Sequence, residues 1–251
     1  MIVWSSLIAV AVAAEVELGV GRAALIQLDP PPTAVNVTRS KVADVRAASP
    51  ALLVIGRAPG TTALTVTQAG QPVPIEIIVD EDTMKDPTGI GVLPAGPRVV
   101  VAPSSGAICR LPFAPSGITR METGLLRVEA FDGTWYWIQS DAVGAFDVVF
   151  ERTRGLPLIL TIVTQGEPAV PEGCLAPEFT VTVPVGGEVT IPVGRQVAGV
   201  LVGHPSLVGV TPDGRSVKMR GLAPGRTSVL VRSEAGDAPW LRTVVVVPPA
   251  E

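Results

Sequence analysis

The chain has 251 residues and a formal net charge of −4, and only 17% of its residues are charged, while glycine and proline number 26 and 25. This length accommodates one to three domains, and the abundance of valine, glycine and proline favours strands and turns over long helices. The 19 basic residues are scattered along the sequence. This excludes the dense Lys/Arg face expected of a nucleic-acid-binding protein.

The N-terminus has the pattern of an export signal. An apolar run, Ile2–Ala14, ends in small residues, and cleavage is predicted before Glu15, so that residues 1–14 form the signal peptide. No Lys or Arg lies at the start of the chain before the apolar run, so the positive segment typical of an export signal is absent. A buried first strand is the alternative. The run is too short to span a bilayer. We therefore expect an exported protein of the periplasm or cell envelope, with no transmembrane segment after signal cleavage.

Residues 21–66 and 186–231 match each other without a gap, at a constant offset of 165 from Gly21 to Gly186 and from Gly60 to Gly225. A repeat of this size indicates tandem small domains and not one enzyme built around one pocket. The predicted fold class is all-β, with three tandem Ig-like β-sandwich modules, because short apolar runs alternate with turn residues about every 8–12 positions.

Module 1 is expected at residues 15–80 and module 3 at residues 178–247. The middle segment, residues 97–164, is interpreted as a diverged third copy, because its apolar positions follow those of module 1 at offsets of 83 and then 84. The proline-rich linkers between the modules are expected to be semi-rigid spacers. In module 1 the predicted strands are Leu25–Leu28, Ala34–Val37, Val42–Val45, Leu52–Ile55, Thr61–Thr67 and Pro74–Val79.

Each clear copy contains a Pro-Gly turn, Pro59-Gly60 in module 1 and Pro224-Gly225 in module 3. Proline presets φ near −65°, and glycine supplies the positive φ that a type II turn requires. An alternating strand pattern follows each turn. The turns are therefore structural and are not phosphate-binding glycine loops, which would precede a helix.

Two cysteines flank most of the middle segment, Cys109 and Cys174. An even number of cysteines in an exported protein suggests a disulfide, which would stabilise the fold by about 4 kcal/mol for a loop of this length. Two buried free thiols are the alternative.

The aromatic run Trp135-Tyr136-Trp137 alternates in the manner of a strand, so the two tryptophans lie on one face and Tyr136 on the other. A tryptophan pair in the core of a sandwich is the favoured interpretation. The alternative is an aromatic contact with a glycan or peptide ligand.

The sequence offers little for catalysis or metal binding. The single histidine, His204, lies in a Gly-His-Pro stretch and is expected to be a solvated loop residue, and no Gly-x-Ser-x-Gly elbow is present. The acidic residues Asp80, Glu81, Asp82 and Asp86 lack the spacing of an EF-hand loop, and a solvated linker is the expectation. We expect a non-enzymatic protein with no cofactor, no metal site and no catalytic residues.

Module 1 resembles the pilus-assembly N-terminal domain that precedes the secretin core in outer-membrane secretins of Tad/Flp-type pilus systems. The resemblance rests on Gly21, Val42, Ala43, Asp44, Val45, Gly56, Pro59, Gly60, Thr61 and Thr62. Module 3 is similar but has Val208 and Gly209 in place of Ala43 and Asp44. The same outline also resembles bacterial Ig-like domains of adhesins and intimins.

The resemblance implies a β-sandwich fold and no catalysis. A secretin would continue into a long barrel-forming region, which this sequence lacks, so the expectation is a stand-alone accessory that binds a secretin or another pilus or secretion complex. A homo-oligomer is left open. The alternative function is a periplasmic or surface adhesive module that binds glycan or peptide through Trp135 and Trp137.

Overall fold

The computed structural model describes residues 14–120, 126–165, 170, 172, 174, 175, 177, 179–234 and 239–249. These residues form strands joined by turns and loops, which confirms the all-β fold class. No helix able to cross a membrane is found in the part of the chain that the structure describes. The predicted signal peptide, residues 1–14, lies outside the described residues except for Ala14. The chain divides into two compact units, residues 1–95 and 96–251.

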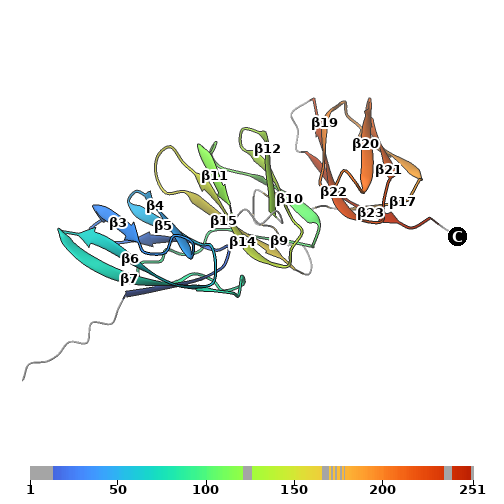
Figure 1. Ribbon diagram of the computed structural model, residues 1–251. Coiled ribbons are helices and arrows are strands. Elements are labelled where there is room, and N and C mark those ends of the chain that lie inside the picture. The colour runs from blue at the N-terminus through green and yellow to red at the C-terminus, as the bar shows by residue number, and fades with distance from the viewer. Residues whose placement is uncertain are drawn as a thin grey trace, which may run out of the picture. The chain divides into compact units, whose positions relative to one another are not determined.

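Unit 1 contains module 1, in which two sheets pack face to face (Figure 1). One sheet has the strand order β3-β6-β7-β1-β8 and the other the order β2-β5-β4. The apolar residues on the inner faces form one core that includes Val16, Val54 and Ile77, each fully buried. The strands are β1 Ala14–Gly19, β2 Ala23–Gln27, β3 Ala34–Val37, β4 Ala43–Ala48, β5 Ala51–Gly56, β6 Gly60–Gln68, β7 Gln71–Asp80 and β8 Thr88–Gly89.

Unit 2 contains two further sandwiches (Figure 1). The middle sandwich, module 2, has the sheets β12-β13-β10-β16 and β11-β14-β15-β9. Its strands are β9 Arg98–Val101, β10 Ser105–Arg110, β11 Gly117–Arg120, β12 Leu126–Asp132, β13 Trp135–Ser140, β14 Gly144–Glu151, β15 Leu158–Thr164 and β16 Cys174–Leu175.

Module 3 has the sheets β17-β23-β22-β19 and β18-β21-β20. Its core includes Val217, Met219 and Val244, which are fully buried. The strands are β17 Thr180–Pro184, β18 Glu188–Pro192, β19 Val197–Val202, β20 Val208–Asp213, β21 Ser216–Gly221, β22 Gly225–Ser233 and β23 Trp240–Val247.

One pairing scheme recurs in the three modules. The order β3-β6-β7-β1 corresponds to β11-β14-β15-β9 and to β19-β22-β23-β17, and the order β2-β5-β4 corresponds to β10-β13-β12 and to β18-β21-β20. The bounds of β18, β20, β21 and β22 are those of β2, β4, β5 and β6 shifted by 165 residues. In the second strand of the last hairpin the offset becomes 167, because Gly60 pairs with Val79 and Gly225 pairs with Val246. The repeat detected in the sequence is therefore also a repeat of hydrogen-bonded registers.

The turn before the longest hairpin of each module requires the same glycine conformation. Gly60, Gly144 and Gly225 have φ values of 137°, 141° and 152°. Residues with a Cβ adopt such values only with strain, whereas glycine adopts them readily. In each module a strand begins at this glycine, one residue before the strand start at Thr61 that the sequence predicts for module 1.

Strands β1 and β17, which open modules 1 and 3, are not among the strands that the sequence predicts. These strands, β1 and β17, pair in parallel with the closing strands β7 and β23 of their modules. The alternation of Ala14–Gly19 is too short to stand out beside the preceding apolar run, which has the pattern of an export signal.

The expectation of spacer-like linkers is wrong in part. After module 1 the chain returns to the edge of β2, where Val92 pairs with Ile26. After module 2 it returns to the corresponding edge of β10, where Cys174 pairs with Cys109. Unpaired backbone groups at a sheet edge favour such pairing, and local composition does not reveal it.

Candidate interaction sites

Within the described residues, no group of three or more His, Cys, Asp or Glu side chains could hold a metal ion. Acidic residues at the end of module 1 and after it form ion pairs with basic side chains. The buried Arg22 pairs with Asp86 at 3.0 Å and donates to the Lys85 carbonyl, while Lys85 pairs with Glu17 and Asp80. The carboxylates are solvated, but Arg22 binds the backbone of this segment, a contact that the sequence does not indicate.

Modules 2 and 3, which both belong to unit 2, contact each other through apolar side chains. Ile108 and Trp137 on the outer face of the β10–β13 sheet pack against Leu230 and Leu241 on the outer face of the β22–β23 sheet. Burial of such apolar area is the main stabilising contribution in domain contacts. We name this cluster the junction.

The junction decides between the two interpretations of the aromatic strand. The tryptophans and Tyr136 do face opposite ways, because Tyr136 packs in the core of module 2 while Trp137 packs in the junction. The prediction of a tryptophan pair in the sandwich core is therefore wrong. A ligand contact at Trp137 is also unsupported, since its exposed fraction is 2%, and Trp135 is half-buried. Aromatic residues on the outer face of a strand suggest a ligand site in the sequence, although in the structure a neighbouring module covers them.

Polar contacts surround the apolar part of the junction. His204 Nε2 lies 3.0 Å from Asp141 Oδ1 and 3.0 Å from Gln139 Nε2. Arg127 donates to the Gly203 carbonyl, and the Gly106 amide donates to Ser228 Oγ at 3.0 Å. His204 does lie in a loop, but it is half-buried against module 2. The expectation of a solvated histidine is wrong because the sequence does not show which module packs against this loop.

Two glycines leave space for side chains at the junction, Gly203 between the two modules and Gly106 beside Trp137 within module 2. A Cβ added to Gly203 would lie 2.0 Å from Gln139 Oε1, and one added to Gly106 would lie 2.5 Å from Trp137 Nε1. Neither glycine has an unusual positive φ. Their role is therefore to leave space, and the sequence alone gives no sign of it.

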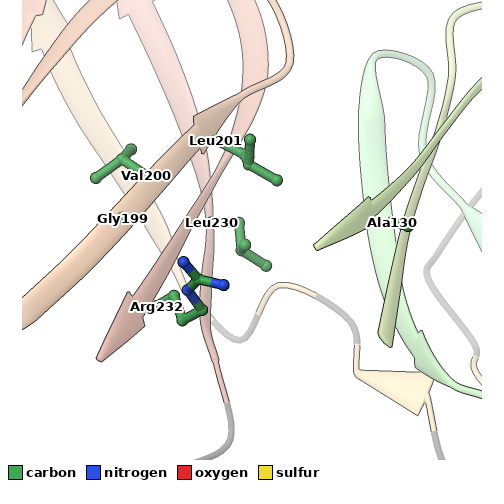
Figure 2. A pocket seen from close by; sticks show the side chains of 6 residues that line it. All are labelled: Ala130, Gly199, Val200, Leu201, Leu230 and Arg232. Atoms are coloured by element: carbon green, nitrogen blue, oxygen red, sulfur yellow. The ribbon is translucent and has the colours of Figure 1, made fainter. Parts of the chain in front are cut away.

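A cavity of about 280 Å³ lies beside the junction, and Figure 2 shows the side chains of Leu201, Leu230 and Arg232 directed from module 3 toward the strand that carries Ala130. Leu201 and Leu230 also belong to the junction cluster. The cavity is thus the margin of the contact between the two modules. Among the described residues, its lining is Ala130, Gly199, Val200, Leu201, Leu230 and Arg232.

Cys109 and Cys174 form a disulfide between β10 and β16, with a Cα–Cα distance of 4.0 Å. The next residue, Leu175, pairs with Ile108 and packs against the junction cluster. The bridge therefore joins the segment leading to module 3 with the strand on which module 3 docks.

In module 1, Asp44 forms ion pairs with Arg57 at 3.0 Å and with Arg46 at 2.8 Å. Partial burial acts to raise the pKa of Asp44, but the hydrogen bonds from Arg57 and Arg46 outweigh it, so the pKa is lowered from its usual 3.8. In module 3 the corresponding residues are Gly209 and Leu222. The charged pair of one module is thus replaced as a unit in the other.

A second cavity, of about 510 Å³, lies on module 1 where β3 ends beside β6 and β7. The lining mixes polar and apolar side chains and comprises Thr38, Arg39, Thr61, Thr62, Ala63, Pro74, Ile75 and Glu76. The buried Thr62 Oγ1 accepts a hydrogen bond from the Arg39 amide at 2.9 Å. Thr61 and Thr62 are part of the Pro-Gly-Thr-Thr motif. The hydrogen bond to the buried hydroxyl gives a structural reason for a threonine at position 62.

The family model described as pilus formation protein N terminal region matches residues 12–80 and again residues 177–247, which together make up more than half of the chain. The two matches coincide with modules 1 and 3. The comparison with curated proteins gave no match.

Solved structures show only distant likeness. The chain is 11% identical to an endo-fucoidan hydrolase from glycoside hydrolase family 107, with a TM-score of 0.23. The alignment covers 93% of this chain and only 43% of the hydrolase chain. For the I9–I11 tandem of titin the identity is 9%, the TM-score 0.20 and the coverage 94% and 98%. For Sidekick-1 immunoglobulin domains 1–4 these values are 16%, 0.24, 94% and 74%. TM-scores of this size carry no argument about function.

Proposed function

The chain belongs to the family of pilus formation protein N-terminal regions, and from this membership we propose that it is a non-enzymatic structural component of a pilus or secretion apparatus. The observation that carries the proposal is the double family match, at residues 12–80 and 177–247. A chain with two copies of an assembly module is suited to holding other proteins in place.

The construction of the junction supports action through protein contacts. Modules 2 and 3 contact each other through an apolar centre with hydrogen bonds around it, as protein–protein interfaces do. The same module type is therefore able to present a flat sheet face to another sandwich. We extend this from contacts within the chain to contacts with other proteins.

At a finer level, we propose an exported protein of the periplasm that binds a secretin-containing complex of the Tad/Flp type. The apolar N-terminal run and the resemblance of Gly21, Asp44, Gly60 and Thr62 to the domain preceding the secretin core support this placement. We further propose that the protein carries out no catalysis, with contacts made by module faces and sheet edges.

The test is recovery of the full chain from cross-linked envelope fractions through an affinity tag, followed by mass spectrometry of the partners. We expect a secretin or another pilus-assembly protein to be enriched over a tag-only control. Enrichment of glycan or cell-wall material alone, with no component of a pilus or secretion apparatus, would contradict the proposal.

A further inference from the structure

The repeat gives every residue of the junction in module 3 a counterpart in module 1. The docked face of module 3 contains Ser228 and Leu230 on β22 and Leu241 on β23. By the offsets of 165 and 167, the corresponding residues of module 1 are Ala63, Thr65 and Pro74, on the outer face of the β6–β7 hairpin. The two faces therefore have the same position in their modules.

The face of module 1 is open where that of module 3 is covered. Arg39, Thr61, Ala63, Pro74 and Glu76 are all exposed, whereas Leu230 and Leu241 are 1% and 3% exposed. The cavity of about 510 Å³ lies on this open face. Four of its lining residues, Thr38, Arg39, Ala63 and Pro74, correspond to the junction residues Gly203, His204, Ser228 and Leu241.

The backbone that carries the charged residue at the rim is fixed in the same way in both modules. The Arg39 amide donates to Thr62 Oγ1 at 2.9 Å, and the His204 amide donates to Thr227 Oγ1 at 2.8 Å. The side chain of Arg39 therefore leaves the module where that of His204 leaves module 3. At this position His204 contacts the carboxylate of Asp141 in module 2.

We propose that the outer face of the β6–β7 hairpin in module 1 is a docking surface for a β-sandwich module of another protein, which presents a carboxylate to Arg39 as module 2 presents Asp141 to His204. This inference rests on the proposed function, because the partner is taken to be a protein of the same assembly. A guanidinium is permanently charged and can bind a carboxylate through two hydrogen bonds, so the position favours an acidic partner.

A second copy of the same chain fits this face less well. The open face of module 3 that corresponds to the docking face of module 2 has Arg220 at the position of Gln139 and Leu222 at the position of Asp141. Arg220 would therefore face Arg39, and like charges in a contact oppose association. The centre of the module 1 face, with Ala63, Thr65 and Pro74, has no large apolar side chain, so leaving it solvated when it is unoccupied costs little.

The experiment places the photo-cross-linking residue p-benzoylphenylalanine at Ala63 of the full chain in cells, with Gln71 at the far end of the hairpin as the control position. We expect Ala63 to cross-link to a β-sandwich segment of another envelope protein. Arg39→Glu should reduce the yield at least about tenfold. Exchange of the facing carboxylate for arginine in the captured segment should restore it.

Arg215→Glu, a charge reversal at an exposed turn of module 3, is the matched control and should leave the yield unchanged. The melting temperature of Arg39→Glu should also be unchanged, because the backbone amide of Arg39 makes the bond to Thr62. No cross-link at Ala63, a cross-link insensitive to Arg39→Glu, or capture of a second copy would each overturn the inference. If tagged protein still recovers pilus or secretion components, only this surface is wrong; if it recovers none, the proposed function itself fails.

Discussion

At the level of single residues, the second threonine after the Pro-Gly turn has one structural role in modules 1 and 3. Thr62 and Thr227 are buried, and each hydroxyl accepts the backbone amide at the loop position occupied by Arg39 or His204. A buried amide without an acceptor costs more than a hydrogen bond contributes. The motif thus fixes the loop at the rim of the sheet face.

We predict that Thr62→Val and Thr227→Val each lower the free energy of unfolding of their own unit by about 1–3 kcal/mol, because valine has the shape of threonine but leaves the amide unpaired. Denaturant unfolding of each variant measures this. Thr61→Val is the control, since Thr61 is exposed and its change should stay within about 0.5 kcal/mol. Equal effects of Thr61→Val and Thr62→Val would contradict the assigned role.

The ion pairs of Asp44 make the stability of module 1 depend on pH. Because the pKa of Asp44 is lowered in the folded state, its stabilising contribution is complete above the unfolded pKa and is lost as the pH falls through the folded pKa. We predict that Asp44→Asn costs about 1 kcal/mol near pH 7 and little near pH 2. Urea unfolding of both proteins over this range gives the difference. Asp213→Asn, which removes a more exposed ion pair with Lys218, should show a smaller difference; a larger one would count against Asp44.

At the level of elements, the contact between the outer sheet faces of modules 2 and 3 is the feature that holds these two modules together. Modules 2 and 3 contact each other face to face, with Trp137 against Leu230 and Leu241. Close packing leaves no space for extra atoms at this contact. Of the two junction glycines, Gly203 is the one at which an added methyl group would be more crowded, 2.0 Å from Gln139 Oε1 and 2.8 Å from Thr227 Oγ1.

We predict that Gly203→Ala weakens the junction by about 1–3 kcal/mol through overpacking. The Gly106 amide, which donates to Ser228 across the junction, should exchange its hydrogen faster, and Trp137 should become more accessible to a fluorescence quencher. Gly209→Ala is the control, since its added Cβ would meet only Leu222 at 3.9 Å. Unchanged exchange at Gly106 in Gly203→Ala would show that the contact tolerates the methyl group.

At the scale of the whole molecule, the two compact units have separate cores, so a change in one need not affect the other. The disulfide belongs to unit 2 alone and closes a loop with a sequence separation of 65. It also positions Leu175 against the junction. Its removal should therefore act on unit 2 and on the contact of module 3 with module 2.

We predict that the double substitution Cys109→Ser and Cys174→Ser destabilises unit 2 by about 4 kcal/mol, chiefly through the entropy gained by the unfolded chain. In calorimetry, the transition of unit 2 should move to lower temperature while that of unit 1 stays in place. The wild-type protein under reducing conditions is the matched comparison and should behave in the same way. A shift of both transitions would mean that the units do not unfold independently.

The sequence by itself determined the fold class, the repeat and most strand positions, since alternation and turn chemistry are local properties of the chain. Pro59-Gly60 and the matching Pro224-Gly225 predicted turns whose glycines have positive φ. Only the tertiary structure decided which outer faces are covered, because that depends on residues far apart in sequence. Trp137 is buried by Leu230 and Leu241, and His204 meets Asp141 across a separation of 63 residues. The same reason applies to Arg39. Its position at the rim of a sheet face is recognised only when module 1 is compared with the docked face of module 3.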